Sequence, residues 1–356
     1  MKAAWLEAIG EPLEIREVPD PVVTISGVVV RVLAVRVPSY TRQVIDGSLG
    51  YDIHPPFIPG PTCVGQVESV GEDVFDINKG DVVLCNSLLS SGDLAHTPDE
   101  ILIAWTGSGS ERSQLMQRFW RNGSFAQLAH YPARCLTVLP EAAQFDRKLV
   151  PFLASIAIAD SGLRRGSLEA GQTVVINGGS GQLGGAAVLL ALAHGAARVI
   201  AIGRNEQRLK ILEQIDGRVS IHVLQSEREK DAAAIHKLAA GPVDLVVDYL
   251  AHTPTPDPTL AGFDVLRLGG VMVLVGGVRH NLPLPYAQIM RRQLTIRGSF
   301  MFDRGSALHS WNLIRSGAVD FTRVKAHSFS LHDIEKAIDI AGTLGGLDYA
   351  LLLPNG

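Results

Sequence analysis

The sequence predicts an α/β protein of two domains, one rich in β-strands and one built on a doubly wound parallel sheet. The first 140 residues contain short strands that end in glycine or proline turns, as small barrels and sandwiches do. From about residue 150, apolar strands alternate with helices, which is typical of βαβ units and a parallel sheet. The length of 356 residues fits two domains at about 150 residues or more for each.

The strands of the N-terminal part follow from β-branched and alternating runs. Residues 28–35 are almost all Val, Leu and Ala, and the run breaks at Pro38. Residues 64–71 alternate between apolar and polar and end in a glycine turn. The turn at 79–81, Lys-Gly-Asp, leads into the apolar strand 82–84. These short strands predict a small barrel-like or sandwich domain.

Residues 86–124 differ from the strands around them. They are rich in Ser and Gly, with aromatic residues such as Trp105 and Trp120 among polar ones. So long an irregular segment in a compact domain is often a functional lobe or lid. A surface insertion that packs its own aromatic side chains is the alternative, and the sequence does not choose between them.

The second part of the chain alternates strands with helices. Its expected strands are 173–177, 198–202, 243–248 and 271–275. Its expected helices are 184–194, 206–214, 305–316 and 332–342, and a last apolar run lies at 350–353. Apolar strands separated by helices predict βαβ units, in which helices cover both faces of the sheet.

Composition and charge exclude several classes of protein. The 32 Lys and Arg and the 36 Asp and Glu are scattered, so no basic face is offered to nucleic acid. The three cysteines lie far apart without CxxC spacing, which argues against a disulfide framework and a cysteine zinc site. The start develops no secretory apolar segment, and the longest uncharged apolar stretch, 149–159, is too short to span a bilayer. We expect a cytoplasmic protein without nucleic-acid or membrane partners.

A glycine-rich loop follows the first strand of the predicted parallel sheet. Residues 179–184 match G-x-G-x-x-G between a strand and a helix, the context that dinucleotide binding requires. The first glycine allows a tight turn, the second lets the backbone approach a pyrophosphate, and the third lets the helix pack on the strand. A glycine-rich turn without a ligand is the alternative. The residues expected to bind the dinucleotide are Gly179, Ser180, Gly181, Gln182, Leu183 and Gly184.

The residues after the second strand indicate which dinucleotide binds. NAD-selective sites place Asp or Glu there, against the ribose 2′-hydroxyl. This chain has Gly203, Arg204 and Asn205 instead, and the planar guanidinium of Arg204 suits a 2′-phosphate. Arg208, one helical turn later, is placed to assist. We therefore expect NADPH to be preferred over NADH; the alternative is that Arg204 is a solvated charge that stacks on the adenine of either cofactor.

The order of the elements and a set of short motifs resemble the medium-chain dehydrogenase/reductase superfamily. The motifs span nearly the whole chain, and their order and spacing are more specific than any one of them. The resemblance implies a GroES-like catalytic domain over 1–148 and 299–356, and a Rossmann dinucleotide-binding domain over 149–298. Besides the glycine loop, the matching motifs are Met1-Lys2-Ala3-Ala4, Pro59-Gly60, Gly65-Gln66-Val67, Val70-Gly71, Lys79-Gly80-Asp81-Val82-Val83, Asn122-Gly123-Ser124-Phe125-Ala126, Ala170-Gly171-Gln172-Thr173-Val174-Val175, Gly269-Gly270 and Gly298-Ser299.

The chain departs from the zinc alcohol dehydrogenases of this superfamily. These enzymes carry a catalytic Cys nine residues before the glycine that matches Gly47, where this chain has Pro38. Their Gly-His-Glu motif, which supplies a second ligand, reads Gly-Pro-Thr at 60–62, and residues 152–157 offer no third ligand. The lobe that carries four structural cysteines in those enzymes has only Cys85. Because catalytic zinc needs about three protein ligands, we expect no zinc.

Without zinc, the chain is most similar to the quinone oxidoreductase and enoyl or alkenal reductase branch. In that branch NADPH delivers hydride to an activated double bond or a quinone, while the protein orients the substrate and stabilises the developing enolate. The resemblance implies a zinc-independent, NADPH-dependent oxidoreductase that acts on a small or medium apolar carbonyl compound. Two alternatives remain: a zinc-independent carbonyl reductase or alcohol dehydrogenase, and a non-catalytic NADPH-binding redox sensor.

Two tyrosines are candidates for the catalytic acid. Tyr40 follows Pro38 and Ser39 in the segment that, by resemblance, faces the nicotinamide, and its hydroxyl would donate to a substrate oxygen. Tyr51 follows Gly50, and some enoyl reductases place a catalytic Tyr just after this glycine. Both are also compatible with an ordinary amphipathic role where two domains meet.

Further residues are expected around the cofactor and the substrate. Open α/β sheets bind ligands at the carboxyl ends of their strands, and a lobe folded over the cleft would form an apolar pocket. The expected additional cofactor contacts are Tyr249, Leu250, Gly276, Gly277, Val278, Ser299 and Phe300. The expected substrate-pocket residues are Ser39, Phe57, Trp105, Trp120 and Met301.

The chain is also expected to form a homodimer. The apolar strand 271–275, if it is the edge of the sheet, would pair with its counterpart across a two-fold axis, as in related enzymes. An open strand edge would otherwise invite aggregation.

Overall fold

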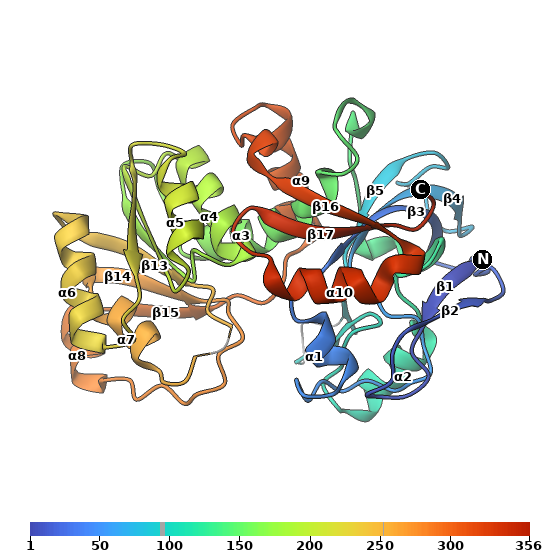
Figure 1. Ribbon diagram of the computed structural model, residues 1–356, viewed down its shortest axis with the longest axis horizontal. Helices are drawn as coiled ribbons and strands as arrows, with labels where there is room; N and C mark the ends of the chain where they lie inside the picture. The colour runs from blue at the N-terminus through green and yellow to red at the C-terminus, as the bar shows by residue number, and fades with distance from the viewer. Residues whose placement is uncertain (93–96, 252) are drawn as a thin grey trace.

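The computed structural model describes residues 1–92, 97–251 and 253–356. Two large sheets lie side by side along the longest axis of the molecule, each with its own helices (Figure 1). One sheet is parallel throughout and the other is mainly antiparallel. The predicted fold class, an α/β protein that combines a β-rich part with a doubly wound parallel sheet, is confirmed.

The parallel sheet is formed by the second half of the chain. Its strands are β10 (Thr173–Asn177), β11 (Arg198–Gly203), β12 (Val219–Val223), β13 (Val243–Asp248), β14 (Leu266–Leu274) and β15 (Thr295–Gly298). Their order in the sheet is β12-β11-β10-β13-β14-β15. The order reverses between β10 and β13, and open α/β sheets bind ligands at such a reversal.

Helices cover both faces of the parallel sheet. They are α3 (Leu153–Arg165), α4 (Gln182–Ala193), α5 (Glu206–Glu213), α6 (Arg228–Ala239), α7 (Asp257–Asp264) and α8 (Tyr286–Arg292). Alternate residues of one strand enter different cores. Val174 and Ile176 pack with α3 and α4, whereas Val175 between them packs with α6 and α7. A strand buried on both faces is apolar throughout, which explains why β10 and β13 have the predicted bounds.

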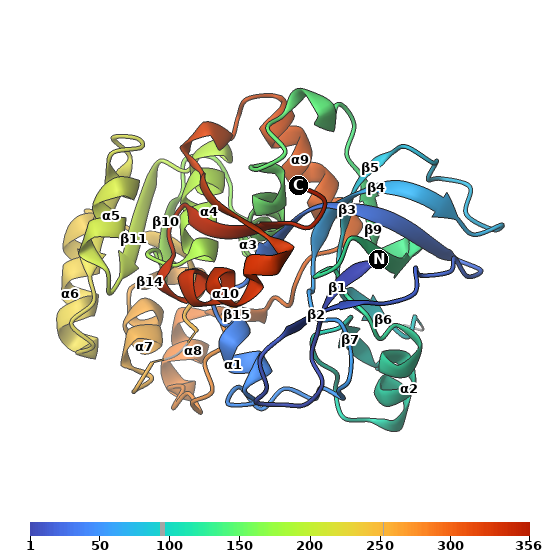
Figure 2. The same cartoon turned by 45° about the vertical axis from the view of Figure 1, so that its right-hand side comes forward.

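The other large sheet joins the two ends of the chain. Its strands are β3 (Gly27–Val37), β4 (Cys63–Val70), β5 (Val82–Cys85), β8 (Leu128–Pro132), β9 (Leu136–Val138), β16 (Lys325–Ser330) and β17 (Asp348–Leu353). The order is β16-β17-β3-β4-β5-β9, and β8 also pairs with β3. β17 runs antiparallel to β3, with Ala350 opposite Val37, so the C-terminal strands complete a sheet that the N-terminal segment begins (Figure 2).

Further helices and short strands connect the two large sheets or pack around the mainly antiparallel one. They are β1 (Lys2–Trp5), β2 (Glu14–Glu17), α1 (Thr41–Ile45), β6 (Leu88–Ser90), β7 (Glu100–Leu102), α2 (Glu111–Phe119), α9 (Arg304–Arg315) and α10 (Ile334–Thr343). The parallel sheet ends at Gly298, after which α9 leads to β16. The predicted domain limits, 148/149 and 298/299, stay predictions.

In its described residues, 86–92 and 97–124, the irregular segment contains a short hairpin and one helix. β6 pairs with β7, and the Ser110 hydroxyl caps α2 by accepting from the backbone N–H of Ser113. Trp105 is fully buried, but Phe119 is 66% exposed. Trp105 and its buried neighbours belong to the core of the β-rich part, so the aromatic side chains of this segment divide between that core and the surface.

The expectation that strand 271–275 forms the edge of the parallel sheet is wrong. This strand is the end of β14, which lies between β13 and β15. The outer strand β15 has the sequence Thr-Ile-Arg-Gly, and its residues are half-exposed or exposed. Four residues with one charge carry too little apolar signal for a strand to be predicted there.

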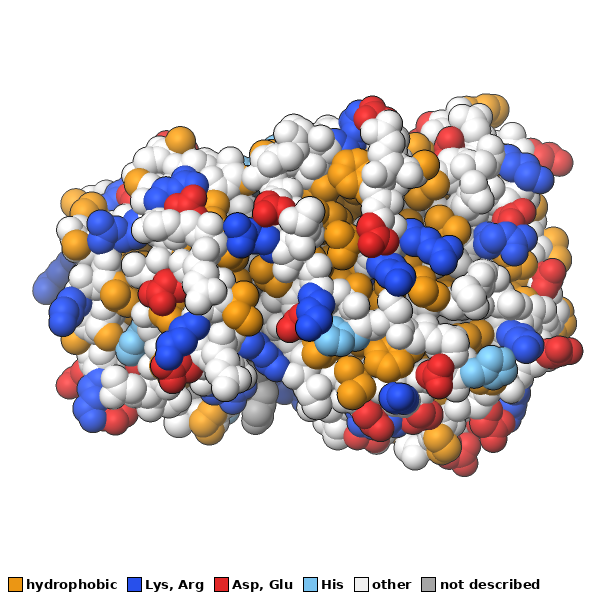
Figure 3. Space-filling view, turned by 45° about the horizontal axis from the view of Figure 1, so that its top comes forward, with side chains coloured by type: hydrophobic (Ala, Val, Ile, Leu, Met, Phe, Trp, Pro, Cys, Tyr) orange, Lys and Arg blue, Asp and Glu red, His pale blue; other side chains and the backbone are white. Residues whose placement is uncertain are grey.

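Two observations concern the surface. Among the helices in the described ranges, none combines the length and the apolar character needed to cross a bilayer. On the face shown in Figure 3, Lys and Arg side chains are interspersed with Asp and Glu.

Candidate active site

The glycine loop lies at the end of β10 and turns directly into α4. The N–H groups of Gly178 and Gly179 both donate to the carbonyl oxygen of Ile202, at 2.9 and 2.7 Å, which ties the loop to β11. Gly178 has a φ of +86°, a conformation that favours glycine. A Cβ on Gly184 would overlap the Gly178 carbonyl oxygen and lie 2.6 Å from the Cα of Gly179. The loop is therefore as tight as the motif requires.

The N-terminus of α4 is open to an anion. Its N-cap, Gly181, is exposed and has no capping side chain, so the first N–H groups of the helix have no acceptor within it. The Gln182 side chain is not free, because its Oε1 accepts from Arg36 at 2.9 Å and its Nε2 donates to the Asp348 carbonyl at 3.2 Å. Leu183 packs against the core. Gln182 and Leu183 could therefore contact the cofactor only through their backbone N–H groups, because both side chains are engaged elsewhere.

A second glycine pair, which the sequence prediction missed, lies against the loop. The N–H of Gly346 donates to the Ser180 carbonyl oxygen at 3.0 Å. A Cβ on Gly345 would lie 2.6 Å from a guanidinium nitrogen of Arg208 and 2.8 Å from the Ser180 oxygen. The only trace of this contact in the sequence is the Gly-Gly pair between α10 and β17. Its partner in the glycine loop, Ser180, is 166 residues from Gly346 along the chain, so sequence spacing could not link the two.

Three polar residues that follow β11, Arg204, Asn205 and Arg208, were candidates to contact the cofactor, and two of their side chains are engaged in hydrogen bonds within the described residues. The Asn205 side chain caps α5 by accepting from the backbone N–H of Arg208 at 3.1 Å. The Arg208 guanidinium donates to the Thr343 carbonyl oxygen. Arg204 is exposed and makes no hydrogen bond or ion pair with any residue in the described ranges. The expectation that Arg208 assists is thus not supported by its side-chain contacts, and Arg204 is the available cation. Beside it, Gly203 has no room for a side chain, since a Cβ there would lie 2.6 Å from the Ser180 Oγ.

The ends of β13 and β14 meet next to the glycine loop. Asp248 is buried; its carboxylate accepts from the N–H of Leu250 at 2.8 Å and from the amide of Asn177 at 3.1 Å. Burial raises the pKa of Asp248 to about 6, against the lowering effect of these hydrogen bonds. A Cβ on Gly276 would overlap the Leu250 carbonyl oxygen and lie 2.7 Å from its carbon, whereas Gly277 faces open space. Two strand ends are therefore packed backbone to backbone.

A small cavity of about 160 Å³ opens between these strand ends. Asp248, Gly276, Val278 and His280 are among its lining residues. Leu250 is buried beside it. Open α/β sheets bind their ligands at such strand ends, so this cavity fits the predicted cofactor side of the site.

Two expected cofactor residues direct their side chains elsewhere. The Tyr249 hydroxyl donates to the Ala159 carbonyl oxygen on α3 at 2.9 Å, and burial raises the pKa of Tyr249 well above its ordinary value. Ser299 is buried, with its hydroxyl 3.4 Å from that of Ser161 on α3. Both side chains therefore anchor α3 to the sheet, and the expected contacts could come only from their backbone.

Tyr40 and Tyr51, the two candidates for the catalytic acid, lie close together in the β-rich part of the molecule. Their ring centroids are 6.5 Å apart at an interplanar angle of 75°, and Tyr40 contacts Trp105 with centroids 6.0 Å apart. Burial raises the pKa of Tyr51 to about 12, while the nearby charge of Arg279 lowers it. The Arg279 guanidinium, in the loop after β14, donates to the Leu49 carbonyl oxygen. This hydrogen bond ties the tyrosine loop to the carboxyl edge of the parallel sheet.

Two cavities lie near the tyrosine pair: Tyr51 lines one, and Trp105, which contacts Tyr40, lines the other. A cavity of about 470 Å³ is lined by Tyr51, by the hairpin of the lobe and by Phe300, which follows β15 and is 58% exposed. A cavity of about 370 Å³ lies within the lobe and is lined by Phe57, Trp105 and Trp120 together with residues of α2. The structure thus brings together three expected pocket residues in one cavity, and Tyr51 with Phe300 in the other.

Ser39 and Met301 line neither of these two cavities. Ser39 is exposed and its carbonyl oxygen faces Gly342 on α10. Met301 has a φ of +54° and packs against both large cores at the point where the chain leaves the parallel sheet. Met301 therefore packs between the two sheets, and its expected place in the substrate pocket stays a prediction. Phe300 has the exposure that a pocket residue needs, and the adjacent positions differ because a left-handed backbone turns one side chain inward.

The residues near the tyrosine pair do not fit a catalytic zinc. Pro38 and Thr62 are buried but offer no thiolate, imidazole or carboxylate, and the segment 152–157 is apolar apart from one serine. Within the described part of the chain, one group of three His, Cys, Asp or Glu side chains has ligand atoms close enough to hold a metal. It lies on α3, on α9 and directly after α4, and its residues line neither cavity near the tyrosine pair. Figures 1 and 2 show α9 toward the top of the view and α1, which follows Tyr40, toward the bottom. The one metal-capable group in the described residues is therefore separate from the tyrosine pair and its cavities.

Comparison with known proteins agrees with this architecture. The model of the alcohol dehydrogenase GroES-like domain matches residues 25–141, and the model of the zinc-binding dehydrogenase family matches residues 183–315. An alcohol dehydrogenase from Moraxella sp. (strain TAE123) is 28% identical over 335 residues, 94% of each chain. An acryloyl-coenzyme A reductase from Metallosphaera sedula is 27% identical over 348 residues, 96% of each chain.

A solved structure shows the same fold. The NADP-bound structure of a Sinorhizobium meliloti 1021 protein of the zinc-binding dehydrogenase type superposes with a TM-score of 0.81, at 21% identity and over 99% of each chain. The two family models cover most of both parts of the chain in the expected order, and the full-length relatives are dehydrogenases and reductases. The chain belongs to the medium-chain dehydrogenase/reductase superfamily and is an NAD(P)-dependent oxidoreductase.

Proposed function

We propose that this oxidoreductase is a zinc-independent, NADPH-dependent reductase of activated double bonds or quinones in small or medium apolar carbonyl compounds. The observation that carries the proposal is the Tyr40–Tyr51 pair, in which Tyr51 lines one cavity and Tyr40 contacts Trp105 of a second, at a place where the residues do not fit a catalytic metal. The name of the Metallosphaera sedula relative, an acryloyl-coenzyme A reductase, supports reduction of a conjugated double bond.

Tyr51 would stabilise the charge that develops on the substrate oxygen. A phenol whose pKa is about 12 stays protonated at neutral pH, so its O–H can donate a hydrogen bond to a carbonyl oxygen as that oxygen becomes negative. The Arg279 guanidinium adds positive potential at the same place. Bound NADPH would supply the hydride.

The aromatic walls would orient the substrate and exclude water. Trp105 is buried against Tyr40, and Phe57 and Trp120 continue the same apolar surface. Such rings would pack against a flat conjugated substrate, and removal of water would strengthen the hydrogen bond from the phenol. Phe300 lies beside Tyr51 and would cover the side that faces the parallel sheet.

Arg204 supports a preference for NADPH. It is a free, exposed guanidinium directly after β11, and the chain has no carboxylate at that position. A 2′-phosphate there would receive charge-assisted hydrogen bonds, whereas the 2′-hydroxyl of NADH would lack its usual acceptor.

Interconversion of carbonyl and alcohol is the second candidate function. The Moraxella relative is an alcohol dehydrogenase, and the same Tyr51 phenol could protonate the alkoxide that forms when hydride adds to the carbonyl carbon. The two reactions differ in the carbon that receives the hydride, and therefore in the product.

The products of one substrate separate these functions. Purified protein is incubated anaerobically with NADPH and a conjugated enal, and the product is identified by NMR. A saturated aldehyde supports double-bond reduction, and an allylic alcohol supports carbonyl reduction. Absence of turnover with a panel of enals, enones and quinones, while NADPH still binds, would contradict both and favour a non-catalytic NADPH-binding protein.

We also propose a homodimer formed through β15. This outer strand of the parallel sheet leaves one edge without a partner within the described residues. The neighbouring α8 exposes Tyr286 (82%) and Met290 (59%), and exposed apolar side chains beside an open strand edge favour association. Light scattering that gives a dimer for the wild type and a monomer for Met290→Asp supports this; a monomeric wild type overturns it.

A further inference from the structure

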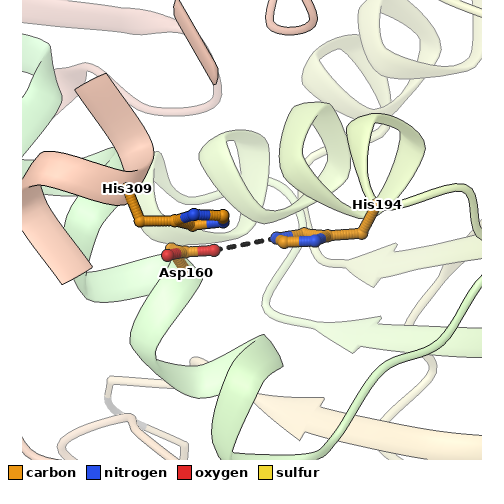
Figure 4. A group of neighbouring side chains, drawn as sticks. All are labelled: Asp160, His194 and His309. Atoms are coloured by element: carbon orange, nitrogen blue, oxygen red, sulfur yellow. Dashed lines mark hydrogen bonds and ion pairs between the residues drawn. The ribbon is translucent and has the colours of Figure 1, made fainter. Parts of the chain in front are cut away.

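Outside the active site, three helices bring one carboxylate and two imidazoles together. Asp160 lies on α3, His194 at the C-terminal end of α4, and His309 on α9 (Figure 4). One ligand atom of each residue lies within 4.8 Å of the others. The His194 Nε2 is 2.8 Å from the Asp160 Oδ1, and the two imidazole rings stack with centroids 5.6 Å apart. The sequence analysis did not predict this cluster, because its three residues come from separate helices and share no local motif.

The polar atoms of this cluster are incompletely satisfied. Asp160 is 0% exposed, and its Oδ2 has no hydrogen-bond partner within the described residues. The Nε2 of His309 is also buried without a partner there. The nearest charge to Oδ2 is an Arg164 guanidinium nitrogen at 4.0 Å, on a side chain that is 50% exposed. A buried carboxylate oxygen and a buried imidazole nitrogen without partners are both costly.

We propose that Asp160, His194 and His309 bind a divalent transition-metal ion, with zinc as the best fit. Two imidazoles and a carboxylate are a normal protein donor set for zinc, whose ligands lie about 2.0–2.2 Å from the metal and therefore about 3.4 Å from each other. The ligand atoms are already within 4.8 Å, so small side-chain rotations would close the site. The ion would satisfy both unpartnered atoms and replace the His194–Asp160 hydrogen bond.

The surroundings allow such an ion to enter. His194 keeps 18% of its side chain exposed, and His309 is also partly exposed, so an ion can reach the cluster and retain a water as fourth ligand. The Arg164 side chain already hydrogen-bonds to the Ser306 hydroxyl at 3.5 Å and can move away from Asp160.

The position of the site assigns it a structural role. α3 and α4 pack on the parallel sheet, whereas α9 follows its last strand and leads the chain back to the other sheet. A bound ion would cross-link these helices and stabilise the native state in proportion to its occupancy. The site is independent of the proposed reaction, since none of its residues lines the cavities beside Tyr40 and Tyr51.

Metal binding is tested on the full chain after treatment with a chelator and removal of the chelator. Calorimetric titration with zinc, metal analysis after desalting, and thermal unfolding are compared for the wild type, His309→Gln and His222→Gln. His222 is the matched control, because its Nε2 lies 2.7 Å from the buried Asp231 in a similar pair that lacks a third ligand. Magnesium, which disfavours imidazole, serves as the control ion.

We expect one zinc per wild-type chain, a higher melting temperature with zinc, and no comparable effect of magnesium. Loss of an outer hydrogen-bond partner alone weakens metal sites by about 10–100-fold, so His309→Gln should weaken zinc binding by at least about tenfold, and His222→Gln should not. Cobalt should give the visible absorption of a low-coordinate site with the wild type, which requires no variant. Zinc binding that is equal in the wild type and His309→Gln, or no saturable binding to the wild type, would overturn the proposal.

Discussion

Replacement of Arg204 by alanine should separate the affinities for NADPH and NADH. The guanidinium is exposed directly after β11 and has no protein partner within the described residues, so its removal should leave the fold intact. Its two polar neighbours cannot compensate, because Asn205 caps α5 and Arg208 is bonded to the Thr343 carbonyl oxygen. The effect therefore falls on the contact with the 2′-phosphate alone.

The expected magnitude follows from the exposure of the pair. A hydrogen bond to a charged group contributes about 1.5–3 kcal/mol, and each 1.4 kcal/mol or so changes a dissociation constant tenfold, which gives a loss of about 10- to 100-fold. Because Arg204 is exposed, salt screens the interaction, and the loss should lie near tenfold at physiological ionic strength and rise at low salt. Binding of NADH, which has no 2′-phosphate, should change by less than about twofold.

The assay is calorimetric or fluorescence titration of both cofactors at two salt concentrations. Arg204→Lys should retain part of the preference, because it keeps the charge and loses the planar fork. Lys210→Ala is the matched control, since Lys210 is an exposed cation on the same helix, α5, that pairs with Glu206 at 2.7 Å. An unchanged NADPH-to-NADH ratio in Arg204→Ala, or an equal loss for both cofactors, would refute the reasoning.

Three further predictions concern packing, chemistry and pH. Gly276→Ala should destabilise the protein by about 1–3 kcal/mol in urea melts, because its Cβ would overlap the Leu250 carbonyl, whereas Gly277→Ala should stay within about 0.5 kcal/mol; equal effects would contradict the packing. Tyr51→Phe should lower kcat about a hundredfold with little change in NADPH affinity, and full turnover would exclude proton donation by Tyr51. The pKa of Asp248 is about 6 in the native state and about 3.9 in the unfolded state. Between these two pH values the native state binds more protons than the unfolded state. The contribution of Asp248 to stability therefore falls as pH rises from about 4 to about 6. Asp248→Asn should therefore gain about 2 kcal/mol relative to wild type between about pH 4.5 and about pH 7, and an equal difference at both values would contradict this.

The parallel sheet and the glycine loop could be predicted because their signals are local. β10 and β13 are buried on both faces, so each is an apolar run with turns at its ends, and both have the predicted bounds. The glycines of the loop are fixed by contacts a few residues away, such as the overlap that a Cβ on Gly184 would make with Gly178. Sequence spacing captures constraints of this range.

The directions of several polar side chains could not be predicted, because distant segments decide them. Tyr249 follows β13 as a cofactor residue would, but its hydroxyl reaches Ala159 on α3. Arg208 lies on the expected side of α5, but its guanidinium is bound by the carbonyl oxygen of Thr343. Neither partner is near in sequence, and in each case a backbone carbonyl oxygen of a distant helix accepts the hydrogen bond that the prediction left to the cofactor.

One contact between the sheets joins the predicted and unpredicted features of the cofactor site. Arg36 extends from β3 toward α4, where its guanidinium donates to the Gln182 side chain at 2.9 Å; burial lowers the pKa of Arg36, but an arginine still remains charged. It forms no ion pair with a carboxylate in the described ranges, so its positive charge is left uncompensated beside the N-terminus of α4. A pyrophosphate bound at that helix terminus would supply the missing negative charge. In the proposed cofactor site, Arg36 would therefore add a positive charge from the β-rich sheet to the helix terminus of the parallel-sheet part.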